Sequence, residues 1–465
     1  MKLRFALALL SCGVFLLESA GQAAVAPKHQ PPNIVFILAD DLGWSELGCY
    51  SNRFNETPNL DRMAGQGMRF TQAYAAAPVC SPTRAAFLTG RTPASLGLTD
   101  YLKPDDEKFL SPNCPTINKQ LKKAGYVSGL VGKWHLNGDY ARQRGTPAQH
   151  GFDEVICSEQ EGIGAGDYWH PYKFMTNVAA KLPSEYLTDR LNLEAVEFIE
   201  RHKEQPFFLY LAHYAPHQML DAKPDKEKKF TAKPGAGKNK NNPKLAAMLE
   251  SIDDGVGLIM AKLDQLELAD NTVLIFMSDN GGERSVTDNF PLRAAKSFLY
   301  EGGLRVPCVV RWPGRIKPSS VSNVPIITHD FYPTFMEIAG VKVDRGHKIE
   351  GKSLTPLFRV GQASSLSLGR RDAHPALKRD TLYWHYPLAK PHFLGGRSAS
   401  AIRKGDFKLI EFLDSNQVEL YDLKNDLSET RDLSVTMPKK VSALLKQLDG
   451  WRKSVGYEMT KAARK

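Results

Sequence analysis

The chain has 465 residues, of which 42% are hydrophobic and 24% are charged. This balance is ordinary for a folded globular protein and excludes a chain that is disordered throughout. The formal net charge is +10, but no nucleic-acid recognition motif accompanies it, so we expect no nucleic-acid partner.

The N-terminus has the pattern of a secretory signal peptide. Lys2 and Arg4 precede an apolar run over residues 5–17, and small residues follow. The run is too short to span a membrane, and no later segment is long and apolar enough to do so. We therefore predict that residues 1–24 are a signal peptide and that the mature protein is secreted or periplasmic. A faint lipoprotein-like stretch ends at Cys12, which leaves lipid attachment as an alternative.

Four apolar runs are typical of strands that are buried on both faces. Polar side chains follow every run and carry oxygen or nitrogen donors. The runs are residues 33–39, 126–131, 207–212 and 272–277, followed respectively by Asp40 and Asp41, by Lys133 and His135, by His213 and His217, and by Asp279 and Asn280. Because ligands bind beyond the carboxyl ends of parallel strands, we expect these side chains to form one site, in which His213 is structural rather than catalytic.

Segments with helical spacing separate the four runs. They are residues 59–70, 116–124, 188–202 and 244–266. Alternation of strands and helices predicts an α/β fold with a large, mostly parallel sheet flanked by helices. We assign it to a catalytic domain over residues 30–350.

The pattern changes near residue 350. Short alternating runs predict a smaller antiparallel sheet, and the segment after them has helical spacing. The runs are residues 382–386, 400–403, 407–412 and 418–421, and the helical segment is residues 438–451. We therefore predict a C-terminal α+β subdomain over residues 351–465, with an irregular connector over residues 364–380.

Asp40, Asp41, Asp279 and Asn280 carry hard oxygen donors, which suit Ca²⁺ or Mg²⁺. Cys80 stands at an expected helix start, because Pro82 fits a first turn. A helix N-terminus stabilises negative charge. From the residues alone, Cys80 is a nucleophile at an anion-stabilising helix end or a small buried cysteine.

The run Cys80-Ser81-Pro82-Thr83-Arg84, with Leu88-Thr89-Gly90-Arg91 after it, resembles the signature of the sulfatase family. In that family a maturation enzyme oxidises the cysteine to formylglycine (3-oxoalanine). Other segments resemble family motifs in the same chain order: residues 33–43, 132–136, 215–217, 296–307 and 421–426. The resemblance implies an alkaline phosphatase-like fold and an arylsulfatase-like sulfuric ester hydrolase. It also implies a metal ion, Ca²⁺ in preference to Mg²⁺, bound by Asp40, Asp41, Cys80, Asp279 and Asn280.

The resemblance further implies a mechanism. A hydroxyl of the hydrated aldehyde at position 80 attacks sulfur, Asp279 accepts its proton, and His217 with Lys296 protonates the leaving oxygen. His135 then removes the second hydroxyl proton, which expels sulfate and restores the aldehyde. The remaining implied roles are orientation of the hydrate by Arg84, neutralisation of sulfate by Lys133, His217 and Lys296, and substrate binding by His385 and Arg397.

The secreted location and the basic charge predict a sulfated carbohydrate as substrate. Lys223 to Lys244 is dense in lysine, and it forms either a solvated loop or a rim that attracts polyanions. Two other functions stay open: a phosphodiesterase or phosphonate hydrolase of the same superfamily, and a non-catalytic protein that binds sulfated glycans. The remaining cysteines, Cys49, Cys114, Cys157 and Cys308, are equally compatible with disulfides and with free thiols.

Overall fold

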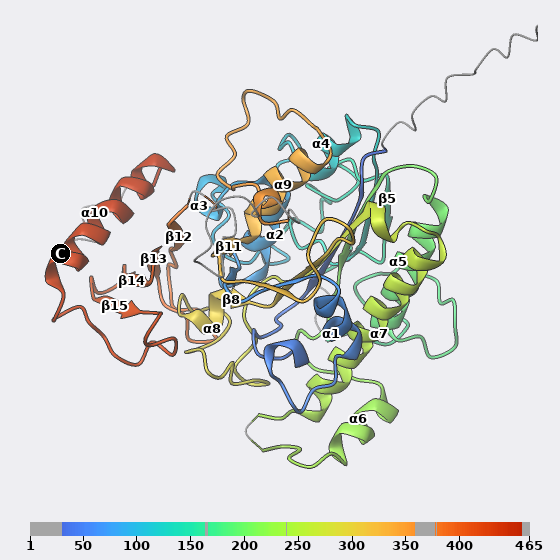
Figure 1. Cartoon of the computed structure of the whole chain (residues 1–465), viewed down its shortest axis with the longest axis horizontal. Coiled ribbons are helices and arrows are strands. Elements are labelled where there is room, and N and C mark those ends of the chain that lie inside the picture. The colour runs from blue at the N-terminus through green and yellow to red at the C-terminus, as the bar shows by residue number, and fades with distance from the viewer. Residues whose placement is uncertain (1–29, 163–165, 239, 359–376, 378, 458–465) are drawn as a thin grey trace, which may run out of the picture. The chain divides into compact units, whose positions relative to one another are not determined.

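Eight strands form the largest sheet of this computed structural model, which describes residues 30–162, 166–238, 240–358, 377 and 379–457 (Figure 1). In spatial order the strands are β10 (Ser320–Ser322), β2 (Met68–Phe70), β9 (Cys308–Arg311), β7 (Thr272–Ser278), β1 (Asn33–Ala39), β6 (Phe207–Ala212), β4 (Val127–Gly132) and β5 (Glu154–Ile156). The five strands from β7 to β5 are parallel to one another, whereas β9 is antiparallel to both β7 and β2. The predicted mostly parallel sheet is confirmed, and the four predicted runs form its central strands.

Helices cover both faces of this sheet, as its fully buried central strands require. Alternate side chains of β1 pack with α2 (Cys80–Thr89), α4 (Ile117–Lys122) and α9 (Phe331–Ile338) on one face. The other face packs with α1 (Pro58–Gly65), α5 (Leu187–Arg201) and α7 (Pro243–Gln265). The site therefore stands on a sheet whose two faces are closed to water.

One predicted helix is wrong over its second half. We expected a helix over residues 59–70, but α1 ends at Gly65 and Met68–Phe70 is strand β2. At Gly67 an added Cβ would lie 2.2 Å from the Val310 carbonyl oxygen, so the chain passes too close to β9 for a helix with side chains.

The C-terminal sheet is antiparallel, in the order β12 (Thr381–Tyr386), β13 (Ala399–Lys404), β14 (Phe407–Phe412) and β15 (Val418–Asp422). α10 (Pro438–Ser454) covers one face through Leu444 and Leu448. The opposite face of this C-terminal sheet packs against segments that lie beside the large sheet. There Trp384 Nε1 donates to the Ala75 carbonyl at 2.9 Å. The predicted small antiparallel sheet with a covering helix is confirmed. Residues 31–465 form one compact unit, and the predicted domain boundary near residue 350 stays a prediction.

The remaining elements are short, and α6 is the longest of them. They are α3 (Pro93–Leu96), α6 (Pro224–Thr231), α8 (Glu301–Leu304), the strands β3 (Ala73–Tyr74), β8 (Arg305–Val306) and β11 (Ile326–Ile327), and the 3-10 helices Gly48–Tyr50, Ala269–Asn271, Thr328–Asp330 and Thr355–Leu357. Across the described ranges, every helix falls short of the length and apolarity that a membrane crossing needs.

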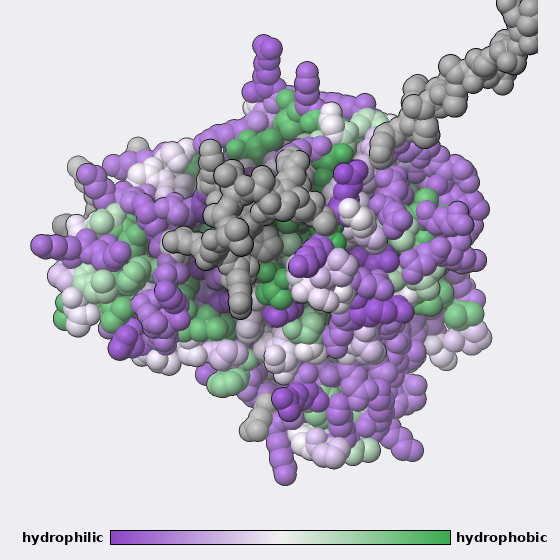
Figure 2. All heavy atoms as spheres, viewed as in Figure 1, coloured by the Kyte–Doolittle hydropathy of each residue, from purple (hydrophilic) through white to green (hydrophobic). Residues whose placement is uncertain are grey.

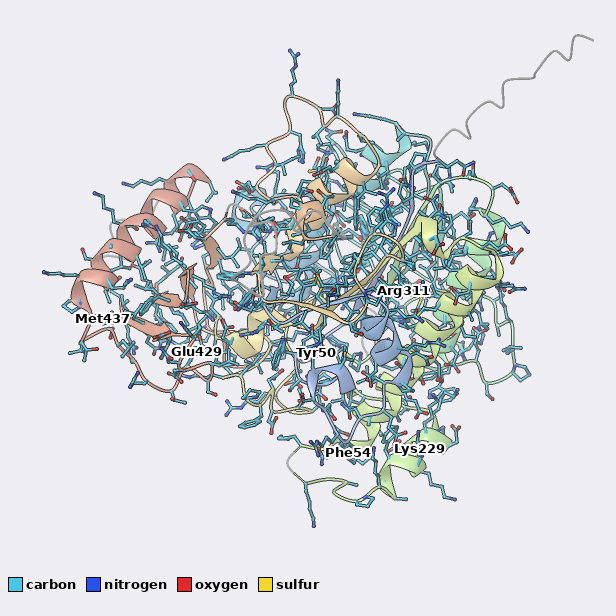
Figure 3. The ribbon with its side chains drawn as sticks, viewed as in Figure 1. Tyr50, Phe54, Lys229, Arg311, Glu429 and Met437 are labelled. Atoms are coloured by element: carbon cyan, nitrogen blue, oxygen red, sulfur yellow. The ribbon has the colours of Figure 1, made fainter. Side chains whose placement is uncertain are left out.

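Hydrophilic side chains cover the molecule around α6, where the lysine-dense segment lies (Figure 2). Several of its lysines form ion pairs with neighbouring carboxylates, as Lys226 does with Asp254 and Lys229 does with Glu56 and Glu250. Figure 3 labels Lys229, which belongs to α6, and Phe54 close to it. This pairing favours the solvated segment over a rim of free positive charge.

The structure does not test two of the predicted segments, but it does test the state of the cysteines. The predicted signal peptide with Cys12 and most of the connector over residues 364–380 lie outside the described residues. Among the described residues, Cys49, Cys114, Cys157 and Cys308 are free thiols, which decides between the two alternatives.

Candidate active site

The carboxyl ends of β1 and β7 bring four oxygen-bearing side chains together. The last residues of these two strands are paired, so Asp40 and Asp41 lie beside Asp279 and Asn280. Asn280 Nδ2 donates to Asp41 Oδ1 at 2.7 Å, and the Asp41 N–H donates to Asp279 Oδ1 at 3.2 Å. All four side chains are buried.

Cys80 is the first residue of α2 and is 2% exposed. Its Sγ and one carboxylate oxygen each of Asp40 and Asp279 lie within 4.8 Å of one another. Burial raises the pKa of the Cys80 thiol, and the charges of Lys133 and Lys296 oppose this without reversing it. An unmodified Cys80 is thus a neutral thiol at neutral pH, which argues against a thiolate nucleophile.

Arg84 lies one turn further along α2 and ties the carboxylates to the helix. Its Nε and Nη2 donate to Asp279 Oδ2 at 3.0 and 2.7 Å, and Nη2 lies 3.5 Å from Asp40 Oδ1. Its Nη1 donates to the Lys133 carbonyl at 3.1 Å. A fully buried guanidinium needs such partners, so Arg84 fixes the end of β4 against those of β1 and β7.

Lys133 and His135 follow β4. Lys133 Nζ lies 2.6 Å from Asp40 Oδ2. Burial would raise the pKa of Asp40, but the charge of Lys133, together with the more distant Arg84 and Lys296, holds this pKa well below its usual range. The positive charges around it therefore keep Asp40 ionised.

His135 is fully buried, and Lys133, Arg84 and Asp40 lie near enough to influence its charge. Its Nε2 lies 2.8 Å from the Leu102 carbonyl, so Nε2 carries the ring proton and Nδ1 is left as an acceptor. Nδ1 is buried without a hydrogen-bond partner in the described part of the chain. Burial, aided by Lys133, lowers the pKa of His135 well below its usual value. The imidazole is neutral and can accept a proton at Nδ1.

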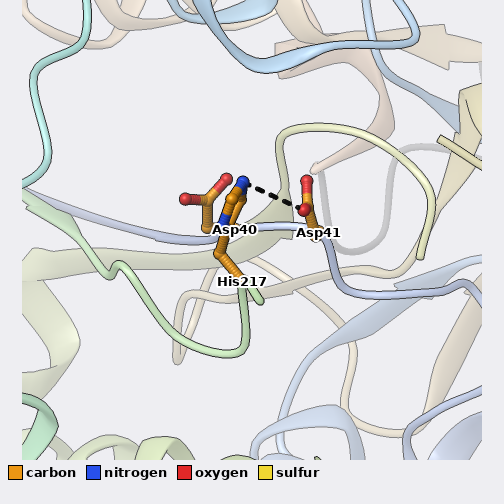
Figure 4. A group of neighbouring side chains, drawn as sticks. All are labelled: Asp40, Asp41 and His217. Atoms are coloured by element: carbon orange, nitrogen blue, oxygen red, sulfur yellow. Dashed lines mark ion pairs between the residues drawn. The ribbon is translucent and has the colours of Figure 1, made fainter. Parts of the chain in front are cut away.

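His217 and Lys296 meet at Asp41 from two other loops. Figure 4 shows His217 and its ion pair with Asp41. Lys296 Nζ lies 2.7 Å from Asp41 Oδ2 and 3.0 Å from His217 Nε2, and this nitrogen lies 3.4 Å from the same carboxylate oxygen. Burial and the Lys296 charge lower the pKa of His217. Burial would also lower the pKa of Lys296, but Asp41 raises it above its usual value. The pair is a charged lysine that donates to a neutral imidazole.

The donor set fits a hard divalent cation. Asp40 Oδ1 and Asn280 Oδ1 are buried and have no hydrogen-bond partner among the described residues. Burial, followed by the charge of Asp40, raises the pKa of Asp279 to about 7, which is the signature of carboxylates packed together without enough positive charge. Such oxygens accept a hydrogen bond or a cation, and buried carboxylates of this kind favour the cation.

The structure brings nearly every residue of the predicted site together. Its members are Asp40, Asp41, Cys80, Arg84, Lys133, His135, His217, Asp279, Asn280 and Lys296. Their individual roles stay predictions, but the expected convergence at one edge of the sheet is observed.

His385 does not lie in this group. It sits on β12 between Trp384 and Tyr386, whose side chains face the large sheet, so its own side chain points to the α10 side. There Nδ1 lies 2.7 Å from Ser400 Oγ, and the ring contacts Tyr457 at a centroid distance of 4.0 Å. Strand alternation therefore removes His385 from the predicted substrate-binding set.

Arg397 lies on a neighbouring surface rather than among the buried charges. It donates to Asp414 at 2.6 and 3.0 Å and lies over the Phe412 ring. Together with Lys240, Arg284 and Arg293 it lines a cavity of about 740 Å³. Its predicted role in substrate binding stays a prediction.

Glu159 is a buried partner of the site that the sequence did not reveal. Its carboxylate accepts the backbone N–H groups of Trp134, at 3.0 Å, and His135, and the Tyr214 hydroxyl at 2.7 Å. It therefore holds the turn that carries Lys133 and His135. Glu159 follows no strand end and belongs to no recognisable motif, so only the folded chain reveals it.

Comparisons with known proteins agree on one family. The family model described as "Sulfatase" matches residues 32–341, and the model described as "N-sulphoglucosamine sulphohydrolase, C-terminal" matches residues 294–454. The chain is 34% identical to N-acetylgalactosamine-6-sulfatase of Canis lupus familiaris, over 75% of this chain and 70% of that protein. It is 30% identical to a sulfatase of Formosa agariphila, over 89% of this chain and 86% of that protein.

A solved structure extends the likeness to three dimensions. The crystal structure of Ps i-CgsB in complex with k-i-k-neocarrahexaose has a TM-score of 0.78 and 29% identity, and the match covers 93% of this chain and 96% of that chain. Steryl-sulfatase of Mus musculus is also similar, at 31% identity over 74% of this chain and 68% of that protein. The relatives thus include proteins named for carbohydrate and for steroid substrates.

Proposed function

The chain belongs to the sulfatase family, and we propose that it removes sulfate from a sulfated carbohydrate by means of a formylglycine made from Cys80 and a bound divalent metal ion. It is an enzyme that hydrolyses sulfate esters, as the family match shows. The carbohydrate, the modified cysteine and the metal are our proposals. The observation that carries them is the buried meeting of Cys80 with Asp40 and Asp279 at the first turn of α2.

Asp40, Asp41, Asp279 and Asn280 would hold the metal ion, with Ca²⁺ as the favoured ion. When bound, the ion supplies positive charge that polarises a sulfate oxygen. The unpartnered oxygens of Asp40 and Asn280 and the raised pKa of Asp279 support this assignment.

The residue at position 80 would carry the nucleophile. When formed, the hydrated aldehyde supplies a hydroxyl that is a better nucleophile than the buried neutral thiol. Asp279 would accept the proton of this hydroxyl, because one of its carboxylate oxygens lies within 4.8 Å of Cys80 Sγ. The charge of Arg84 orients the group against Asp279.

Lys133, Lys296 and His217 surround the same space with positive charge and proton donors. Lys296 Nζ lies 3.0 Å from His217 Nε2, and we propose that these two side chains together supply the proton to the leaving oxygen. Lys133 neutralises charge on the sulfate oxygens. His135 Nδ1, which is neutral and unpartnered in the described part of the chain, serves as the acceptor of a proton from the second hydroxyl.

The experiment compares matched cysteine variants. We expect Cys80→Ala to lower kcat/KM on 4-nitrophenyl sulfate by about a thousandfold or more, because it removes the nucleophile. Cys157→Ala changes a similarly buried thiol outside the site and should keep the parent activity. Both variants should keep the parent Tm within a few degrees.

Two results would overturn the proposal. Peptide mass analysis of active protein that finds an unmodified thiol at position 80 refutes the formylglycine. Faster turnover of bis(4-nitrophenyl) phosphate than of the sulfate ester would favour the phosphodiesterase alternative. Release of sulfate from a panel of defined sulfated saccharides, measured against aryl and steroid sulfates, tests the substrate class.

A further inference from the structure

A loop of the C-terminal region packs directly against the segment that carries Lys296. At Gly396 an added Cβ would lie 1.9 Å from the Ser297 carbonyl oxygen, and at Gly395, where φ is 97°, it would lie 3.0 Å from the Phe298 ring. The approach is possible because neither residue has a side chain. It brings His392, which donates its N–H to the Gly396 carbonyl at 2.8 Å, to the Lys296 side of the site.

Tyr101 reaches the same place from the opposite side. The next residue, Leu102, contacts His135 Nε2 through its carbonyl at 2.8 Å and donates its N–H to Ser81 Oγ at 3.0 Å. The residue after Tyr101 therefore contacts both a site histidine, His135, and the neighbour of Cys80, Ser81. These two contacts anchor Tyr101 beside the site.

Three rings meet where these two segments come together. The Tyr101 and His392 centroids are 5.4 Å apart, those of His392 and Phe393 are 4.4 Å apart, and those of Tyr101 and Phe393 are 6.3 Å apart. Phe393 is 75% exposed although it belongs to this cluster. A single exposed phenylalanine is ordinary, but one that completes a ring cluster beside buried charges has an apolar face ready for a ligand.

His392 adds an unsatisfied donor to the cluster. Its Nδ1 accepts the Leu394 N–H at 3.1 Å, so in the neutral ring the proton is on Nε2. Burial and the nearby Lys296 lower the pKa of His392 to about 4, so the ring is neutral at pH 7. His392 is 7% exposed, and its Nε2 is buried without a partner in the part of the chain that the structure describes. A buried donor of this kind costs free energy until a ligand satisfies it.

We propose that Tyr101, His392 and Phe393 form the subsite for the sugar ring that carries the sulfate. The aromatic faces cover the C–H face of a pyranose, and His392 Nε2 donates to one of its hydroxyl groups. This inference rests on the proposed function, because it places the ring next to the sulfate position at Lys296. It also replaces the predicted His385 with another histidine of the C-terminal region.

Equilibrium binding to the inactive Cys80→Ala protein tests the subsite without turnover. Galactose 6-sulfate, N-acetylgalactosamine 6-sulfate and inorganic sulfate are titrated by calorimetry. We expect at least one sulfated sugar to bind more tightly than inorganic sulfate. Phe393→Ala should weaken that binding about tenfold and leave the affinity for inorganic sulfate unchanged, because sulfate has no ring to stack.

Two further variants separate stacking from general damage. Phe393→Tyr keeps the ring and should keep the parent affinity. Val435→Ala truncates a comparably exposed apolar side chain near α10 and should change neither ligand's affinity. The proposal is overturned if no sulfated sugar binds more tightly than sulfate, or if Phe393→Ala leaves the sugar affinity within twofold of the parent.

The outcome is independent of the test for catalysis. A parent enzyme that hydrolyses 4-nitrophenyl sulfate while Phe393→Ala binds sugar normally keeps the proposed function and loses the subsite. Sugar binding that depends on Phe393, in a protein without sulfatase activity, keeps the subsite and refutes the proposed function.

Discussion

Two buried charge networks of this protein use the same residue types for different ends. The first, which we call the catalytic network, consists of Asp40, Asp41, Asp279, Arg84, Lys133 and Lys296. The second, which we call the sheet network, lies where the C-terminal sheet meets α8 and consists of Glu301, Glu429, Lys408, Arg305, Arg403 and Tyr74. Figure 3 labels Glu429 in that region.

The sheet network is saturated. Lys408 Nζ lies 3.0 Å from one oxygen each of Glu301 and Glu429, although its contact with Glu429 is an ion pair without hydrogen-bond geometry. The second oxygen of Glu301 accepts the Tyr74 hydroxyl at 2.8 Å, and the second oxygen of Glu429 accepts the Glu301 N–H at 2.7 Å. All four carboxylate oxygens thus have a nitrogen or hydroxyl partner within 3.0 Å, whereas the cation paired with Asp40 Oδ1, Arg84 Nη2, lies 3.5 Å away.

The catalytic network is not saturated. Asp40 Oδ1 and Asn280 Oδ1 are buried without hydrogen-bond partners in the described residues. Lys296 Nζ donates to the neutral His217 ring as well as to a carboxylate. Buried polar groups are normally paired. The comparison teaches that burial and charge alone do not mark an active site, whereas unused capacity inside a buried network does.

The largest expected effect on activity comes from replacing one carboxylate of the catalytic network by an amide. The same replacement in the sheet network is the control. Asp279→Asn should lower kcat/KM on 4-nitrophenyl sulfate by about a thousandfold, because it removes the proposed proton acceptor and a proposed metal ligand together. Glu429→Gln is the matched change in the sheet network and should keep activity within about threefold of the parent. Steady-state kinetics measure both, and an Asp279→Asn enzyme within tenfold of the parent would contradict the assignment.

Removing a lysine should lower the free energy of unfolding more in the sheet network than in the catalytic network. Lys408→Met leaves Glu429 buried without its cation and leaves Glu301 with Arg305 at 3.4 Å, and we expect a loss of about 3–5 kcal/mol in the free energy of unfolding, measured in urea. Lys296→Met should cost less stability, because Asp41 keeps Asn280 as a donor, but it should remove most activity. A Lys408→Met protein as stable as the parent would show that the sheet network contributes nothing.

The catalytic network could be predicted from the sequence because parallel strands bring consecutive strand ends to one edge. Asp40 and Asp279 each follow an apolar run by one or two residues, so a pattern in one dimension implied a cluster in three. The sheet network has no such rule. Glu301 and Lys408 are 107 positions apart, and their pairing depends on how the second sheet docks.

The errors have the same origin. The family resemblance made His385 of the C-terminal region a candidate for substrate binding, but strand alternation turns it toward α10. Phe393 and His392 lie in a loop, where no periodicity says which way a side chain points. The helix expected over residues 59–70 fails where the close approach to β9 outweighs local helical spacing.

Metal removal should distinguish the networks by a smaller effect on stability. Chelation with EDTA should abolish activity, and Ca²⁺ at about 100 times its Kd should add about 2.7 kcal/mol to the unfolding free energy. Asn280→Ala removes one proposed ligand and should reduce this gain, whereas Glu429→Gln should keep it. Thermal unfolding with and without Ca²⁺ measures the effect. A Tm that is independent of Ca²⁺, with activity unaffected by EDTA, would refute the metal site.

The smallest expected effect is a difference in pH dependence that originates in the sheet network. Burial, against the attraction of Lys408, raises the pKa of Glu429 from 4.5 to about 7. A group whose pKa is raised on folding contributes its stability below the unfolded value, and this contribution is lost as the pH rises through the folded value. For Glu301, burial is outweighed by Lys408 and the nearby arginines, and its pKa falls to about 2, so its contribution is constant between pH 4.5 and 7.

The parent should therefore lose stability relative to Glu429→Gln as the pH rises from 4.5 to 7. Each pH unit between the folded and unfolded pKa values corresponds to about 1.4 kcal/mol, and Glu429 titrates together with Glu301, so we expect the difference between the two proteins to change by roughly 2 kcal/mol. Urea unfolding of both proteins at several pH values measures it, and all other titrating groups cancel in the difference. Parallel curves would mean that Glu429 is ionised throughout, and that Lys408 balances two full negative charges.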